Sequence, residues 1–261
     1  MEILLAIPFG LAIGLVVGTV GGGGAILALP VLVYVLDEGV GPASTASLVV
    51  VAVAASVGAG SQARDGQLCR QVAIVFSLPA AFGAYLGTLA SAEVDARTQI
   101  LLFIPVMLSA AVMTYRRGSE QAAVEDGPGE CPRASLLVAT AAGLGVGVMT
   151  GFFGVGGGFL IVPALTILLA VPMRKAIATS LAIITLTGLA ALASHLAEGA
   201  NPNWGLTVIL AGAAAAGALA GSSLGRRLPE RALAHGFGVV VATVALVLLV
   251  DVLVLGGPPV G

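Results

Sequence analysis

The chain carries the stretch Gly151-Phe-Phe-Gly154-Val-Gly156-Gly157-Gly158, and an earlier stretch, Gly18-Thr-Val-Gly21-Gly22-Gly23-Gly24, resembles it. Each lies inside an apolar block about twice as long as the other blocks, at 135–171 and 3–36. Glycine in a helix interior costs about 1 kcal/mol relative to alanine. The two glycine runs therefore predict that a helix is broken partway along each long block.

The composition indicates a protein of the lipid bilayer. Of 261 residues, 58% are hydrophobic and 9% are charged, whereas an average soluble domain has about 25% charged residues. A soluble fold of this size leaves a large surface in water, which such a sequence cannot cover. The net charge of −2 provides no electrostatic footprint for nucleic acid.

The remaining apolar blocks have the length of membrane-spanning helices. About 20 residues of helix cross the hydrocarbon core, and most of these blocks have 18 to 22. They cover residues 43–60, 72–90, 98–115, 176–194, 205–224 and 233–254. We therefore expect an all-α polytopic membrane protein.

The two long blocks match each other when residue 10 is placed on residue 143. The register continues without a gap to residue 32 on 165, and a match of this length that includes a proline indicates an internal duplication. Identical pairs include Gly14/Gly147, Gly18/Gly151, Gly21/Gly154, Gly23/Gly156, Gly24/Gly157 and Pro30/Pro163. The same offset of 133 later pairs Ser47 with Ser180.

The basic residues favour one topology for the long blocks. If each block enters the membrane and returns, ten of the 11 basic residues share one side, and only Arg97 lies on the other. If each block crosses once, the same residues divide five against six. Cytoplasmic loops are enriched in Lys and Arg, so the first model is preferred. The ten are Arg64, Arg70, Arg116, Arg117, Arg133, Arg174, Lys175, Arg226, Arg227 and Arg231.

This topology makes the second half an inverted copy of the first. We expect two transmembrane repeats, 1–115 and 135–261, joined by a cytoplasmic linker, 116–134, and together forming one transport domain with both termini outside the cytoplasm. Each repeat begins with a glycine-broken hairpin and continues with three transmembrane helices. Residues 25–36 would form a helix of only about 18 Å, which favours a re-entrant hairpin over two full crossings.

Broken helices in inverted repeats are typical of secondary transporters, whose substrates bind near the midplane. The helix that restarts after each break presents free N–H groups and a positive dipole end, which suit an anion. The expected substrate-binding residues are Gly21, Gly22, Gly23, Gly24 and Ala25 in one repeat and Gly154, Gly156, Gly157, Gly158 and Phe159 in the other.

Hydroxyl residues open the next span of each repeat, and Ser47, Thr179 and Ser180 are further candidates for substrate contact. Their alternative role is packing between membrane helices. Gln62 and His195 align in the two repeats and are candidates for a cavity mouth, with an interfacial histidine as the alternative. Other four-residue glycine spacings, such as Gly10/Gly14/Gly18, are assigned to helix packing.

No residue pattern points to a catalytic, metal or cofactor site. Cys69 and Cys131 have no metal-ligand spacing, and we expect inert thiols, with a single disulfide as the alternative. An intramembrane hydrolase using His195 with Ser180 or Ser194 is a weaker hypothesis, because the sequence has no nucleophile elbow.

The stretch Gly143-Leu-Gly-Val-Gly147, the glycine run through Gly158 to Pro163, and Ala176-Ile-Ala-Thr179-Ser180-Leu181 together resemble the sulfite exporter TauE/SafE family. The first repeat carries a weaker version of this pattern, and the resemblance spans essentially the whole chain. The first repeat departs from the pattern of the second at Thr19-Val20, where the second repeat has Phe152-Phe153. The two halves of the expected site therefore differ chemically.

The resemblance implies a multi-pass permease of the bacterial inner membrane that exports small sulfur-containing anions such as sulfite, thiosulfate or sulfoacetate. Protons or another ion are the expected coupling partners, and no cofactor is implied. A passive anion channel of the same fold is the main alternative. The sequence does not reveal the particular anion, the direction of transport, the coupling ion or the oligomeric state.

Overall fold

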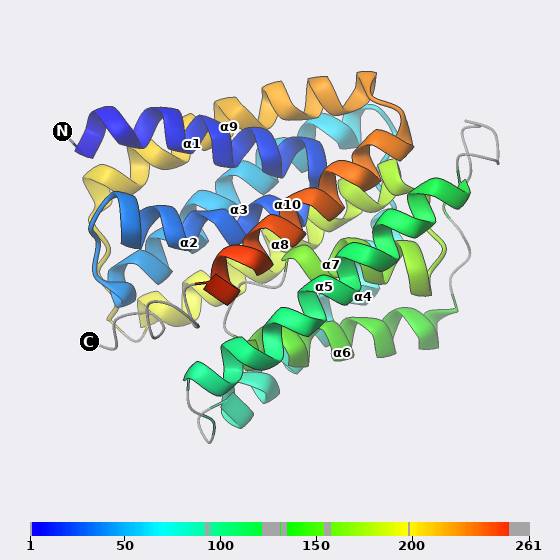
Figure 1. Cartoon of the computed structure of the whole chain (residues 1–261), viewed down its shortest axis with the longest axis horizontal. Coiled ribbons are helices and arrows are strands. Elements are labelled where there is room, and N and C mark those ends of the chain that lie inside the picture. Colours follow the sequence, from blue (N-terminus) through cyan, green and yellow to red (C-terminus); the bar gives the residue numbers. More distant parts are fainter. Residues whose placement is uncertain are drawn as a thin grey trace.

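The computed structural model describes residues 2–91, 94, 96–121, 131, 135–153, 158–197 and 199–250, and every regular element in these ranges is helical (Figure 1). The elements are α1 (Glu2–Val20), η1 (Gly22–Leu27), α2 (Ala28–Pro30), η2 (Val31–Val35), α3 (Val40–Arg64), α4 (Arg70–Ser91), α5 (Ala96–Gln121), α6 (Leu136–Phe153), α7 (Gly158–Pro163), η3 (Ala164–Leu168), α8 (Met173–Ala197), α9 (Trp204–Arg227) and α10 (Glu230–Val250).

Six of these helices are long and apolar enough to cross a membrane: α3, α4, α6, α8, α9 and α10. Large apolar side chains also cover the outside of the bundle, with Leu78 72% and Leu137 79% exposed. Such a surface suits lipid and not water. The expected all-helical, multi-pass membrane protein is confirmed, and α5 continues beyond the expected end at residue 115.

Glycines on α1 and α9 bring these two helices into backbone contact at one edge of the molecule (Figure 1). A Cβ atom at Gly14 would overlap the carbonyl oxygen of Ala214, and one at Gly18 would overlap that of Ala218. The residue numbers rise together, so α1 and α9 run parallel.

The same arrangement joins α6 to α4. Cβ atoms at Gly147 and Gly151 would overlap the carbonyl oxygens of Ala80 and Ala84, again with rising numbers on both helices. The interpretation of these spacings as helix packing is confirmed. Lipid supplies no hydrophobic force between helices, so close backbone approach provides the attraction.

Irregular backbone features recur 133 residues apart along the chain. The π-helical segments η2 and η3 are each followed by a non-glycine residue of positive φ, Asp37 (51°) and Ala170 (50°). Gly66 (70°) and Gly199 (83°) also have positive φ. The amide of Glu38 donates to the carbonyl of Leu32, and that of Val171 donates to that of Leu165, both at 3.0 Å.

The expectation of two inert thiols is wrong, because Cys69 and Cys131 form a disulfide with their Cα atoms 5.8 Å apart. Sequence spacing gave no indication of this pair, since 62 residues separate the two cysteines. The bond ties Cys131, in the segment between the halves, to the buried start of α4.

The glycine contacts predict a difference between two neighbouring positions on α6. Gly147→Ala places a methyl group on the Ala80 carbonyl and is expected to lower the free energy of unfolding by about 1–3 kcal/mol. Gly145 is exposed with no atom within 4 Å of its Cβ position, so Gly145→Ala is the matched control and is expected to be neutral or stabilising by up to about 1 kcal/mol. Thermal unfolding in detergent micelles measures both, and equal midpoints would contradict the packing role.

Candidate anion-binding site

Gly22 of the first glycine run and Gly158 of the second are in contact. A Cβ atom at Gly22 would overlap the carbonyl oxygen of Gly158, and one at Gly158 would lie 2.8 Å from the carbonyl oxygen of Gly22. Gly22 is the first residue of η1 and Gly158 is the first described residue of α7, so the two segments that follow α1 and α6 are in backbone contact. Any side chain at either position would force these backbones apart.

A buried hydroxyl faces this contact. Gly21 has a φ of +78°, a conformation that side chains disfavour, and its Cβ position lies 2.8 Å from Oγ of Ser180. Ser180 is fully buried, and its Oγ donates to the carbonyl of Ile177 at 2.8 Å. The oxygen therefore keeps an unused lone pair and stands directly beside the break.

The restarted helices are short and irregular. From Gly22 the chain forms η1, α2 and η2 as far as Val35, and Gly23, Gly24 and Ala25 lie within η1. From Gly158 it forms α7 and η3 as far as Leu168. Helix starts leave backbone N–H groups without intrahelical partners, and the dipole there favours negative charge. Gly154, Gly156 and Gly157 lie outside the described residues.

The side chain of Phe159 belongs to an aromatic cluster. It packs edge-on against Phe103 with ring centroids 5.2 Å apart, and Phe103 in turn lies 5.0 Å from Phe153. Phe159 is 1% exposed. These rings form an apolar wall behind the start of α7, which leaves only the backbone of Phe159 for a ligand.

The other predicted polar residues are placed apart from the contact. Oγ1 of Thr179 accepts the amide of Cys69 at 3.2 Å, and Oγ of Ser47 donates to the carbonyl of Ser44 at 2.8 Å. Nδ1 of His195 lies 3.1 Å from Oγ1 of Thr45, a residue with no exposed surface.

Gln62 and His195 have different surroundings. Gln62 is 6% exposed and lines a cavity of about 310 Å³, which we call the α8–α9 cavity. Five helices contribute its lining, which comprises Gly18, Thr19, Gln62, Asp65, Gln67, Arg174, Ile177, Ser222, Gly225, Arg226 and Leu233. Ile177 also packs against the Gly21 position, so the cavity lies next to the glycine break.

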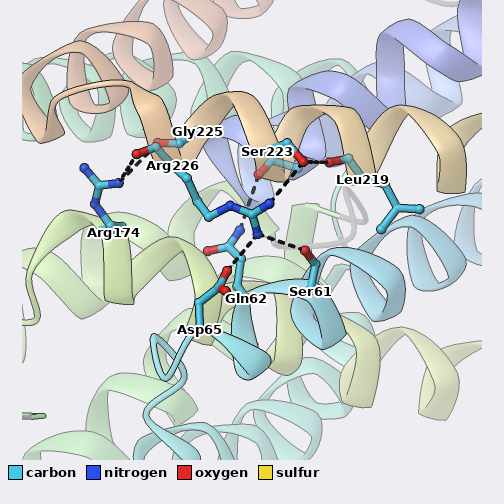
Figure 2. A network of polar contacts seen from close by, with 9 residues as sticks. Ser61, Gln62, Asp65, Arg174, Leu219, Ser223, Gly225 and Arg226 are labelled. Carbon is cyan, nitrogen blue, oxygen red and sulfur yellow. Dashed lines mark hydrogen bonds and ion pairs between the residues drawn. The ribbon is translucent and has the colours of Figure 1, made fainter.

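Two arginines organise the α8–α9 cavity (Figure 2). Arg226 donates to Oδ2 of Asp65 at 2.7 Å, to Oγ of Ser61 at 3.3 Å and to Oγ of Ser223 at 3.2 Å. Arg174 donates to three carbonyls at the end of α9, those of Gly225, Arg226 and Leu228.

Sequence reasoning missed Asp65, Arg174, Ser222 and Arg226. In the sequence, each arginine lies at the end of an apolar block and indicates only which side of the membrane its loop faces. The folded chain brings the ends of α3 and α9 and the start of α8 together, and no spacing in the sequence indicates that meeting.

His195 pairs with neither of the two serines considered for a hydrolase, Ser180 and Ser194. Ser180 donates to Ile177 and Ser194 donates to Ala190, whereas His195 pairs with Thr45. Among the residues that the structure describes, no three His, Cys, Asp or Glu side chains gather in a way that could hold a metal ion.

Comparison with known proteins identifies the family. The family model described as "Sulfite exporter TauE/SafE" matches residues 6–248. A probable membrane transporter protein of Xylella fastidiosa is 32% identical over 258 residues, covering 94% of both chains. The probable membrane transporter protein YunE of Bacillus subtilis is 26% identical over 254 residues, covering 89% of this chain and 92% of the relative.

No solved structure matches the chain with significance. The family match and the relatives indicate a membrane transporter and not an enzyme. The family model covers nearly the whole chain, from within α1 to near the end of α10. The chain therefore belongs to the sulfite exporter TauE/SafE family.

Proposed function

We propose that the chain is a secondary transporter of small sulfur-containing oxyanions, such as sulfite, thiosulfate or sulfoacetate, which it exports across the bacterial inner membrane by alternating access. The anion binds where the two glycine breaks meet. The backbone contact between Gly22 and Gly158, with the hydroxyl of Ser180 beside it, is the observation that carries the proposal.

The chemistry of this region suits an oxyanion. Two helix starts and a hydroxyl provide hydrogen-bond donors and dipoles without a full positive charge. Irregular backbone at membrane depth requires burial in protein or a cavity, and Gly21, Gly22 and Gly158 are buried. The anion then accepts hydrogen bonds from backbone N–H groups. It also replaces the carbonyl oxygen of Ile177 as the acceptor of the hydrogen bond from the Ser180 hydroxyl.

The helix directions support an inverted repeat. Tyr115 stacks on His235, and the Gly238 position contacts Ala111, so α5 and α10 run antiparallel. Consecutive helices of a hairpin are antiparallel, so α9 runs opposite to α10 and α4 runs opposite to α5. It follows that α9 and α4 have opposite directions, and so do their parallel partners α1 and α6 (Figure 1). Segments that match at the 133-residue offset thus have opposite directions, as alternating access between two inverted halves requires.

The lengths of the hairpin arms refine the proposal. A helix of 19 residues, such as α1, is about 28 Å long and reaches across the hydrocarbon core. The second arm, 22–35, is too short to do so if helical. We propose that the first arm crosses fully and the second arm returns only partway, which places the break inside the membrane.

For orientation, we propose that the end with the α8–α9 cavity faces the cytoplasm, because the loops there hold most of the basic residues. The disulfide between Cys69 and Cys131 lies at the same end.

Flux into proteoliposomes tests the transport function. We expect sulfite or thiosulfate to move against its own gradient when a proton gradient is imposed, whereas chloride does not. A passive channel moves anions only down their gradient, so that outcome would replace the transporter with a channel. Movement of an unrelated solute and of no sulfur anion would remove the substrate assignment.

A methyl group at the break tests the binding site. Gly21→Ala adds a Cβ atom 2.8 Å from Oγ of Ser180, and we expect sulfite flux to fall about tenfold or more, with membrane insertion retained. Gly199→Ala is the control, because Gly199 has the same positive φ, at +83°, with no atom within 4 Å of its Cβ position. An equal loss in both variants would mean that backbone strain alone causes the effect.

The Ser180 hydroxyl is tested by removal. Hydrogen bonds to charged groups contribute about 1.5–3 kcal/mol, so Ser180→Ala is expected to raise the KM for sulfite by about tenfold or more. Ser109→Ala is matched to it, because the exposed Ser109 makes the same bond to the carbonyl three residues earlier, at 2.8 Å. A KM in Ser180→Ala equal to that of the Ser109 variant excludes contact with the anion.

Reporter fusions test the orientation. We expect green fluorescent protein fused after Gln121 to fluoresce, as it does in the cytoplasm, and alkaline phosphatase fused after residue 261 to be active outside it. The opposite pair of results would reverse the proposed orientation and would place the disulfide in an oxidising compartment.

A further inference from the structure

A buried hydroxyl in the α8–α9 cavity has no partner. Two buried hydroxyl oxygens, those of Thr114 and Ser222, make no hydrogen bond in the described part of the chain, and only Ser222 lines this cavity. Ser222 is 1% exposed. A buried polar atom without a hydrogen bond is costly, which indicates that a ligand or solvent atom satisfies it.

The charges around this hydroxyl favour an anion. The cavity lining holds two guanidinium groups, Arg174 and Arg226, against one carboxylate, Asp65. Glu230 lies nearby but accepts the amides of Met173 and Arg174 at the start of α8 and does not line the cavity. The lining therefore has a net positive charge.

Asp65 occupies the place that an oxyanion would take. Its carboxylate accepts Nη1 of Arg226 at 2.7 Å, in a pair that is 39–42% exposed. Exposed ion pairs contribute little to stability, so an incoming anion can displace the carboxylate at small cost. Arg174 is held in place by its hydrogen bonds to three carbonyl groups. The side-chain amide of Gln62 donates to the carbonyl of Gly18 at 3.4 Å, and a hydrogen bond this long is readily exchanged for one to an anion.

We infer that the α8–α9 cavity is a second oxyanion site, in which a sulfur oxyanion displaces Asp65 from Arg226 and accepts the hydroxyl of Ser222 before it moves to the glycine break. The choice of a sulfur oxyanion rests on the proposed function. Ile177 lines the cavity and also contacts the Gly21 position, so the cavity and the glycine break are adjacent. An anion that enters from the end with the basic loops therefore binds in the cavity first and at the break second.

The site belongs to one end of the molecule only. At the offset of 133, the position of Arg174 is occupied by Gly41. One inserted residue in the second repeat, after which Gly83 aligns with Gly217, makes the later offset 134 and places Arg226 on Ala92. Neither Gly41 nor Ala92 carries a charge. The position of Ser222 corresponds to Thr88, whose hydroxyl is partnered, since it donates to the carbonyl of Ala84 at 3.0 Å. The other repeat therefore provides no counterpart of this pair of arginines.

Two substitutions at the ion pair test this site because they act in opposite directions. The full chain in lipid nanodiscs is titrated calorimetrically with sodium sulfite under anaerobic conditions, with sodium chloride as the comparison salt. Arg226→Gln is expected to raise the Kd for sulfite about tenfold. Asp65→Asn is expected to lower it several-fold, because it removes the competitor of the anion and leaves the guanidinium free.

A purely structural ion pair predicts a different result, since both substitutions break the same link between α3 and α9. Equal changes in both variants, or no change in either, would overturn the inference. Both are also titrated in the Gly21→Ala background, in which the glycine break is obstructed and the cavity is measured alone.

A second pair of variants tests the hydroxyl itself. Ser222→Ala and Thr114→Val each remove one buried, unpartnered hydroxyl, and removing an unsatisfied group is nearly neutral for folding. We expect a several-fold higher Kd for sulfite in Ser222→Ala and an unchanged Kd in Thr114→Val. An unchanged Kd in Ser222→Ala would overturn the role of this hydroxyl.

These measurements separate the cavity site from the proposed function. If the wild-type chain binds sulfite in the cavity but transports no sulfur anion, the function fails and the cavity site stands. If it transports sulfite and the three cavity variants, Arg226→Gln, Asp65→Asn and Ser222→Ala, leave binding unchanged, the cavity site fails and the function stands.

Discussion

Close approach of helix backbones at glycine is the interaction on which the rest of this structure depends. Lipid does not drive apolar helices together, so contact must come from surfaces that fit at short range. Gly14 and Gly18 on α1 face alanine carbonyls of α9, and Gly147 and Gly151 on α6 face those of α4. Each first helix of one half is thereby held by a helix of the other half, and both starting helices are fixed at their ends, where the breaks begin.

The proposed anion-binding region follows from that packing. With α1 and α6 held in place, the next residues of each chain segment meet at Gly22 and Gly158, where neither residue has a side chain. Ser180 of α8 completes the region from one side, and the ring of Phe159 packs away from it among other aromatic rings. Backbone groups and one hydroxyl thus remain for an anion. Such a site contains no fixed counter-charge, and the positive charge lies instead in the α8–α9 cavity beside it.

Part of this architecture could be predicted from the sequence, because helix packing, helix breaks and membrane spans each depend on residues that are close together in the chain. The glycine spacing indicated helix packing, the runs at 21–24 and 154–158 indicated breaks, and the lengths of the apolar blocks indicated the spans. The role of Arg226 could not be predicted in this way. Its neighbours Asp65 and Ser61 lie on another helix, more than 160 residues away, and only the folded bundle joins them. The Cys69–Cys131 disulfide was only an alternative in the sequence, because nothing in the chain shows that two cysteines 62 residues apart meet in the fold.

The central claim is that an oxyanion binds at the meeting of the two glycine breaks. An experimental structure of the chain in nanodiscs with bound selenite, a heavier analogue of sulfite, tests it most directly. The account predicts density for selenium beside Gly22 and Gly158, with an oxygen within about 3 Å of Oγ of Ser180. Backbones that stay in contact there, with selenite bound only elsewhere, would contradict it.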